Sequence, residues 1–91
     1  MREGVVIADR FEVETLVGVG GMGSVFRAHD RHTGQRVAVK VLKERSEGAA
    51  ARFLLEARVL ADLHHPGIVR YVSHGATVAG DQYLAMEGWT G

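Results

Sequence analysis

A glycine-rich turn and a lysine-bearing strand lie close together in the sequence, and this pair constrains what the 91-residue chain can fold into. The turn reads Gly18-Val19-Gly20-Gly21-Met22-Gly23-Ser24-Val25, a G-x-G-x-x-G-x-V pattern with an additional glycine at Gly21. The strand reads Val37-Ala38-Val39-Lys40 and carries one cation among apolar residues. Glycines let backbone N–H groups approach phosphate oxygens, because no side chain intervenes. Together the two segments indicate a flexible lid over phosphates and a cation that reaches under it.

The segments around the glycines have the pattern of β-strands. Residues 11–17 alternate, with Phe11, Val13, Thr15 and Val17 on one side, and a strand is expected to end where the glycines begin. Residues 24–29 read as the returning strand of a hairpin, and residues 36–42 form a third strand rich in valine. The polar turn 30–35 joins the last two. These connections are short enough for adjacent strands to pair in an antiparallel meander.

The apolar spacing changes after the third strand. Residues 49–63 carry apolar side chains at three- and four-residue steps, which predicts one face of a helix. Pro66 ends this pattern because the residue before a proline avoids helical angles. Residues 68–73 and 82–87 then read as two further strands. The sequence therefore predicts an α+β fold, a five-stranded antiparallel sheet with one main helix packed on it.

One acidic residue on the helix departs from the apolar pattern. Glu56 lies on the stripe shared by Phe53 and Leu60, where a solvent-facing charge is not expected. One explanation is a carboxylate at the rim of the stripe that pairs locally with Arg52, four residues earlier. The other is that Glu56 points at the sheet and meets Lys40, since a partly buried charge needs a partner. The pattern alone leaves both explanations open.

Three nucleotide-binding architectures compete for the glycines, and a plain hairpin turn is the fourth explanation. A mononucleotide P-loop needs a lysine at the position where Ser24 stands. A dinucleotide-binding fingerprint needs a helix directly after the glycines, but residues 24–28 have strand chemistry. Only the hairpin lid of protein kinases uses both Val25 and a lysine on the following strand. The presence of Lys40 also argues against a turn without function.

Composition excludes several classes of function. Lysine plus arginine and aspartate plus glutamate each number 11, so zero net charge offers no electrostatic basis for binding nucleic acid. The chain has no cysteine, which excludes disulfides and thiolate metal sites. No apolar run approaches the roughly 18–20 residues of a membrane span, and the first residues lack the apolar core of a secretion signal. We therefore expect a soluble, cytoplasmic chain without a membrane segment.

Two histidines flank an aspartate in the polar turn between the second and third strands. His29, Asp30 and His32 could be imagined as metal ligands. No cysteine or third convergent ligand supports such a site, so we interpret these histidines as solvated turn residues and expect no metal.

Taken together, these motifs resemble the N-terminal, ATP-binding lobe of a eukaryotic-type protein kinase. The chain is most similar to bacterial serine/threonine kinases, whose lobes often carry a Gly-Gly-Met-Gly lid and a Val-Ala-Val-Lys-Val-Leu strand. The resemblance covers about residues 10–86 and includes the helix segment 52–57 and the following segment 65–69. It implies that residues 1–91 form the N-terminal lobe of a kinase domain, with the C-terminal lobe absent.

The resemblance also implies an ATP site and the roles of its residues. Lys40 would hold the α- and β-phosphates, and Glu56 would orient Lys40 through an ion pair; these are the two catalytic residues that it implies. Leu60 and Tyr71 would belong to an apolar stack that couples the helix to the other lobe. Met86 would be the gatekeeper at the back of the pocket, and the backbone of Glu87 and Trp89 would read the adenine edge. The implied ATP-binding residues are Val17, Gly18, Val19, Gly20, Gly21, Met22, Gly23, Val25, Ala38, Lys40, Met86 and Glu87.

The family's remaining catalytic elements do not occur within these 91 residues. There is no H-R-D catalytic loop with its asparagine and no metal-binding D-F-G. The resemblance implies phosphoryl transfer from ATP to serine or threonine of a protein substrate in the full-length family, with Mg²⁺ expected only alongside the C-terminal lobe. We expect this chain to be inactive by itself. The alternative is a non-catalytic, pseudokinase-like module that binds another protein.

Overall fold

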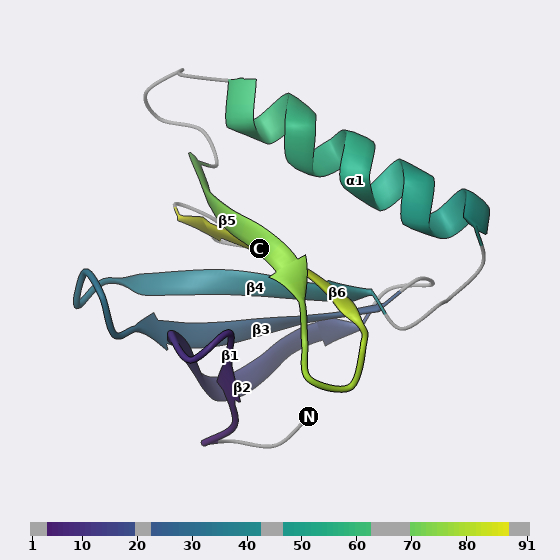
Figure 1. Ribbon diagram of the computed structural model, residues 1–91. Coiled ribbons are helices and arrows are strands. Elements are labelled where there is room, and N and C mark those ends of the chain that lie inside the picture. Colours follow the sequence, from purple (N-terminus) through teal and green to yellow (C-terminus); the bar gives the residue numbers. More distant parts are fainter. Residues whose placement is uncertain (1–3, 20–22, 43–46, 63–69, 88–91) are drawn as a thin grey trace.

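A computed structural model describes residues 4–19, 23–42, 47–62 and 70–87, and within the third range the side chains of residues 48–55. Six strands form one antiparallel, curled sheet, and a single described helix lies across one of its faces (Figure 1). The strand order in the sheet is β1-β2-β3-β4-β6-β5. The elements are β1 (Val6–Ile7), β2 (Phe11–Val19), β3 (Gly23–Asp30), β4 (Arg36–Leu42), α1 (Glu47–Asp62), β5 (Arg70–Ala76) and β6 (Gln82–Glu87).

The predicted fold class is confirmed, with one more strand than expected. The additional strand is β1, which pairs with the beginning of β2 through Ile7 and Phe11. Its tight turn places Ala8 and Asp9 at φ values of 55°, a left-handed conformation that residues other than glycine rarely adopt. No glycine or asparagine marks this turn, and Asp9 alone is a weak turn signal.

Two elements have the expected bounds, and the other expected elements differ by one to three residues at their described ends. β4 and β6 have the predicted ends, whereas β2 extends to Val19 and β3 begins at Gly23. α1 begins at Glu47 rather than at residue 49, and β5 runs from Arg70 to Ala76. The predicted start of that strand at 68–69 and the predicted helix end at 63 lie outside the described residues.

β2 does not keep the simple alternation that the sequence predicted through Val17. Its register with β3 shifts once between Val13 and Thr15 and again between Leu16 and Gly18. Each shift is a β-bulge, in which one strand carries a residue without a direct partner. Thr15 and Val17 are consequently exposed rather than continuing the buried row of Phe11 and Val13.

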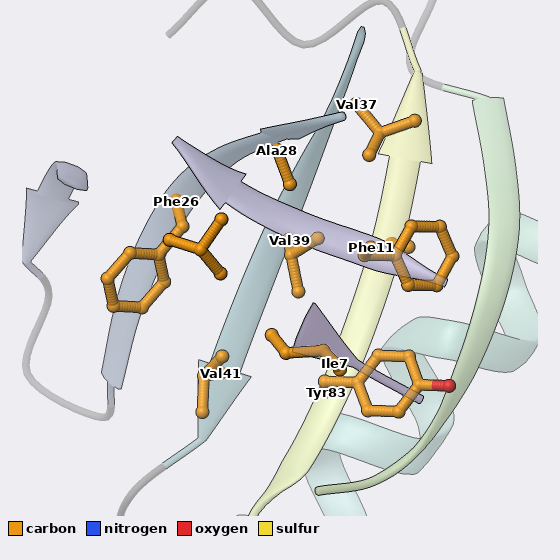
Figure 2. Close-up of a cluster of buried hydrophobic side chains, with 10 residues drawn as sticks. Ile7, Phe11, Phe26, Ala28, Val37, Val39, Val41 and Tyr83 are labelled. Carbon is orange, nitrogen blue, oxygen red and sulfur yellow. The ribbon is translucent and has the colours of Figure 1, made fainter. Parts of the chain in front are cut away.

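The main core lies on the face of the sheet away from α1. Figure 2 shows its side chains gathered between the curled strands. The rings of Phe11 and Tyr83 meet edge to face with centroids 6.0 Å apart, which links β2 to β6. The buried residues of this cluster are Ile7, Phe11, Val13, Phe26, Ala28, Val37, Val39, Val41, Tyr83 and Ala85.

A second, smaller cluster lies between the sheet and α1. The helix contributes Ala49 and Phe53, which are spaced by one helical turn and are both buried. Val25 and Tyr71 are half-buried and pack against the edge of the cluster. Its buried sheet residues are Ala38, Leu42, Leu84 and Met86. This cluster packs α1 against the face of the sheet that carries Ala38 and Met86.

Among the described residues, one charged side chain is buried, that of Asp30 at the end of β3. Asp30 is fully buried, and Arg10 donates to its two oxygens from Nε and Nη2, each at 2.8 Å. The backbone N–H of His32 donates to the same carboxylate at 2.9 Å. Asp30 thereby joins the β1–β2 turn to the β3–β4 turn. These hydrogen bonds, that of Arg10 above all, hold the pKa of the Asp30 carboxyl well below its usual range although burial acts to raise it.

Candidate nucleotide site

The register of four strands sets Gly18, Val25, Lys40 and Leu84 in one row across the sheet. Gly18 of β2 lies opposite Val25 of β3, which lies opposite Lys40 of β4, and Lys40 lies opposite Leu84 of β6. Val25 and Leu84 belong to the cluster beneath α1, so the row lies on that face. The neighbours of Lys40 along β4, Val39 and Val41, belong to the main core on the other face. Strand alternation therefore places half-buried Lys40 on the face of α1.

A second row lies beside the first and is mostly apolar. Ala38 of β4 lies opposite Met86 of β6 on one side and Arg27 of β3 on the other. Ala38 and Met86 are 6% and 5% exposed. The two rows together give an apolar surface with one lysine at its side, an arrangement suited to a flat base and its attached phosphates.

The two described glycines at the ends of the lid differ in what surrounds them. A Cβ atom added at Gly18 would meet nothing within 4 Å, so the space above it is open. A Cβ at Gly23 would overlap the carbonyl oxygen of Val41 on the neighbouring strand. The fold thus requires glycine at Gly23 but not at Gly18, where the absent side chain leaves room for a ligand to approach the backbone. This open position fits a phosphate-bearing group.

The predicted ion pair between Lys40 and Glu56 stays a prediction. Glu56 lies within α1, but its side chain is outside the described residues. Position 56 follows Phe53 by three residues and Ala49 by seven, so helical periodicity puts it on the side of α1 that faces the sheet. Arg52, the local alternative partner, is exposed.

The other predicted site residues divide into described and undescribed positions. Val17 and Val19 flank Gly18 and are 38% and 73% exposed, which leaves apolar surface at the lid. Glu87 is half-buried at the end of β6, opposite Arg70 of β5, and Tyr71 lies opposite Met86. The predicted positions Gly20, Gly21, Met22, Leu60 and Trp89 lie outside what the structure describes, the side chain in the case of Leu60.

Leu84 is a site residue that sequence reasoning missed. It is fully buried directly across from Lys40, and it forms part of the apolar wall beneath α1. The signal was present, because Met86 was singled out and alternation along 82–87 places Leu84 on the same face.

Two features of the described residues bear on other classes of site. Within the described ranges, no three histidine or acidic side chains gather closely enough to hold a metal ion. His29 and His32 are exposed, while Asp30 between them is engaged by Arg10. No helix in the described part of the chain is long and apolar enough to cross a membrane.

Comparison with known proteins adds a family to this geometry. The family model described as the protein kinase domain matches residues 11–91. The chain is 40% identical to the serine/threonine-protein kinase PknA of Mycobacterium tuberculosis over 93 residues, which cover 94% of this chain and 22% of that protein. It is 51% identical to the serine/threonine-protein kinase PknD of Chlamydia trachomatis over 63 residues, covering 66% of this chain and 7% of PknD.

Solved structures show the same arrangement of elements. The crystal structure of the Mycobacterium tuberculosis PknI kinase domain superposes with a TM-score of 0.75 and 28% identity, covering 94% of this chain and 35% of that one. A double mutant of the same domain gives a TM-score of 0.76 over 34% of its chain. The present chain thus spans about a third or less of each protein that it matches here.

Proposed function

Since the chain belongs to the protein kinase domain family, we propose that it forms the ATP-binding lobe of a serine/threonine protein kinase. The observation that carries the proposal is the row from Gly18 through Val25 and Lys40 to Leu84. It joins an open glycine, an apolar wall and a cation on one face of the sheet. ATP, when bound, supplies the phosphoryl group that the family transfers to a protein hydroxyl.

Each part of the row has a distinct task in this proposal. Lys40 neutralises the α- and β-phosphates, and Glu56 on α1 orients its ammonium group. Gly18 and the glycines that follow it let the lid close over the phosphates. Adenine lies against the apolar wall. The gatekeeper Met86 and the backbone of Glu87 lie at the inner edge of the adenine. The wall residues are Val17, Val25, Ala38, Leu84 and Met86.

Nucleotide binding by this chain tests the proposal directly. We expect ATP with Mg²⁺ to raise the melting temperature of the chain, and Lys40→Met to remove most of that increase. Arg36→Met is the matched control, because Arg36 begins the same strand but is 68% exposed and contacts Glu14 at 3.5 Å. Equal ATP responses in the wild type and Lys40→Met would refute the assignment of Lys40.

A second experiment separates a kinase from a non-catalytic binding module. The reading frame beyond Gly91 should encode an H-R-D catalytic loop and a D-F-G segment if the parent protein transfers phosphate. A protein that includes those segments should phosphorylate a generic protein substrate with ATP and Mg²⁺, and Lys40→Met should abolish the activity. ATP binding without any phosphoryl transfer in that longer protein would favour the module instead.

A further inference from the structure

We propose that Arg27 forms a cationic outer rim of the nucleotide pocket and gives it a preference for adenine-site ligands that carry an acidic group. The inference rests on the proposed function, because it takes the apolar wall as the adenine site. Arg27 lies on β3 directly opposite Ala38 of β4 and Thr15 of β2. It is two residues from Val25, so strand alternation places both on the same face of the sheet.

The position of Arg27 beside the wall follows from the β2–β3 bulge. The register shift after Val13 brings Thr15, rather than Glu14, opposite Arg27. A short hydroxyl-bearing side chain therefore stands where regular pairing would have placed a carboxylate. Arg27 is exposed, and its long side chain can reach across the edge of the wall while its guanidinium stays in water.

Two acidic side chains of β2 contact other arginines. Glu12 accepts from Arg31 at 2.9 Å, and the Glu14 carboxylate is 3.5 Å from Arg36. Among the ion pairs of the described residues, none includes Arg27. The edge of the apolar wall beside Arg27 thus presents a positive charge, whereas the phosphates are assigned to the row of Lys40, one row further along the sheet.

A carboxylate on a ligand is the group that this charge recognises best. Guanidinium binds carboxylate through two parallel hydrogen bonds, which adds direction to the attraction. Because the rim is exposed to water, the gain is that of a surface pair and not of a buried one. We expect roughly a two- to fivefold increase in affinity for an acid over its uncharged ester, reduced by salt.

The experiment compares acid and ester ligands on the full chain. The probes are adenosines that carry a short carboxyalkyl chain at C2, N6 or C8, each with its methyl ester, and dissociation constants are measured by calorimetry. In the wild type, the acid should bind about two- to fivefold more tightly than the ester for at least one attachment point. The ratio should fall to about one in Arg27→Gln and invert in Arg27→Glu. Arg36→Gln, on the neighbouring strand but outside the row, should keep the wild-type ratio.

The outcomes distinguish this inference from the proposed function. If ATP binds the wild type but the ratio is the same in Arg27→Gln for all three attachment points, the rim assignment is wrong and the ATP site stands. If neither ATP nor any adenosine binds the wild type, both are overturned. A ratio that falls equally in Arg36→Gln and Arg27→Gln would indicate general surface charge and would also overturn the assignment.

Discussion

Replacement of Asp30 by asparagine tests how much of the stability of this fold depends on one buried carboxylate. Asp30 is fully buried and accepts both hydrogen bonds of the Arg10 guanidinium, while the Arg10 side chain keeps 22% of its surface exposed. The pair connects the turn after β1 with the turn after β3. An asparagine has the same size but only one acceptor oxygen, and its NH₂ group would face a guanidinium that only donates.

The expected loss follows from the burial of the two partners. Breaking a buried ion pair by removing one partner costs about 3–5 kcal/mol. Arg10 can regain water through its exposed part, and hydrogen bonds to charged groups contribute about 1.5–3 kcal/mol. We therefore expect Asp30→Asn to lower the free energy of unfolding by about 2–3 kcal/mol. For a domain of this size, that corresponds to a decrease of roughly 10–20 °C in melting temperature.

The chain offers a matched control for this measurement. Glu12 and Arg31 form an ion pair at 2.9 Å near the same turns, but their side chains are 44% and 47% exposed. An exposed pair contributes less than about 1 kcal/mol, so Glu12→Gln should change the unfolding free energy little. Urea denaturation of both variants measures the difference. Equal losses in Asp30→Asn and Glu12→Gln would refute the reasoning from burial.

Two further predictions concern pH and the lid glycines. The pKa of Asp30 is depressed in the folded protein, so its contribution to the free energy of unfolding is present above the unfolded pKa of about 3.9 and is lost as the pH falls toward the folded pKa. Unfolding free energies measured between pH 6 and pH 2 should therefore decline more steeply for the wild type than for Asp30→Asn. Parallel curves for the two proteins would contradict this. Gly23→Ala should destabilise the fold by about 1–3 kcal/mol, because its Cβ would overlap the Val41 carbonyl oxygen. Gly18→Ala should change stability by less than about 1 kcal/mol and instead weaken ATP binding. Thermal melts with and without ATP measure both effects. Similar stability losses in Gly18→Ala and Gly23→Ala would show that the space around each glycine does not decide the outcome.

The regular parts of the sheet could be predicted from sequence, because their patterns are local. β4 is a short valine-rich run bounded by a polar turn, and β6 is a short apolar run, so their ends followed from composition and spacing. β1 was not predicted, because its turn places Ala8 as well as Asp9 in a left-handed conformation, and alanine carries no turn signal. The bulges in β2 depend on pairing with β3, and pairing is not encoded in the alternation of one strand.

The candidate site shows the same division between local and tertiary information. Lys40 and Ala38 were identified from a strand motif, and the register places them in adjacent rows beside Val25. Leu84 enters the site only because β6 inserts between β4 and β5, which the chain order does not reveal. The sequence placed Asp30 in a polar turn, whereas Arg10, twenty residues away, makes it a buried acceptor.

The paired bulges of β2 constrain which length changes this hairpin can accept. Between Val13 and Gly18 the strand holds two residues without direct partners on β3, one at each register shift. Removing one unpaired residue, such as Glu14, would delete its bulge and keep Val13 opposite Ala28 and Gly18 opposite Val25. Removing more than these two residues would shift the pairing and turn Gly18 or Val13 to the other face of the sheet. Homologous lids should therefore be shorter within this segment by no more than two residues.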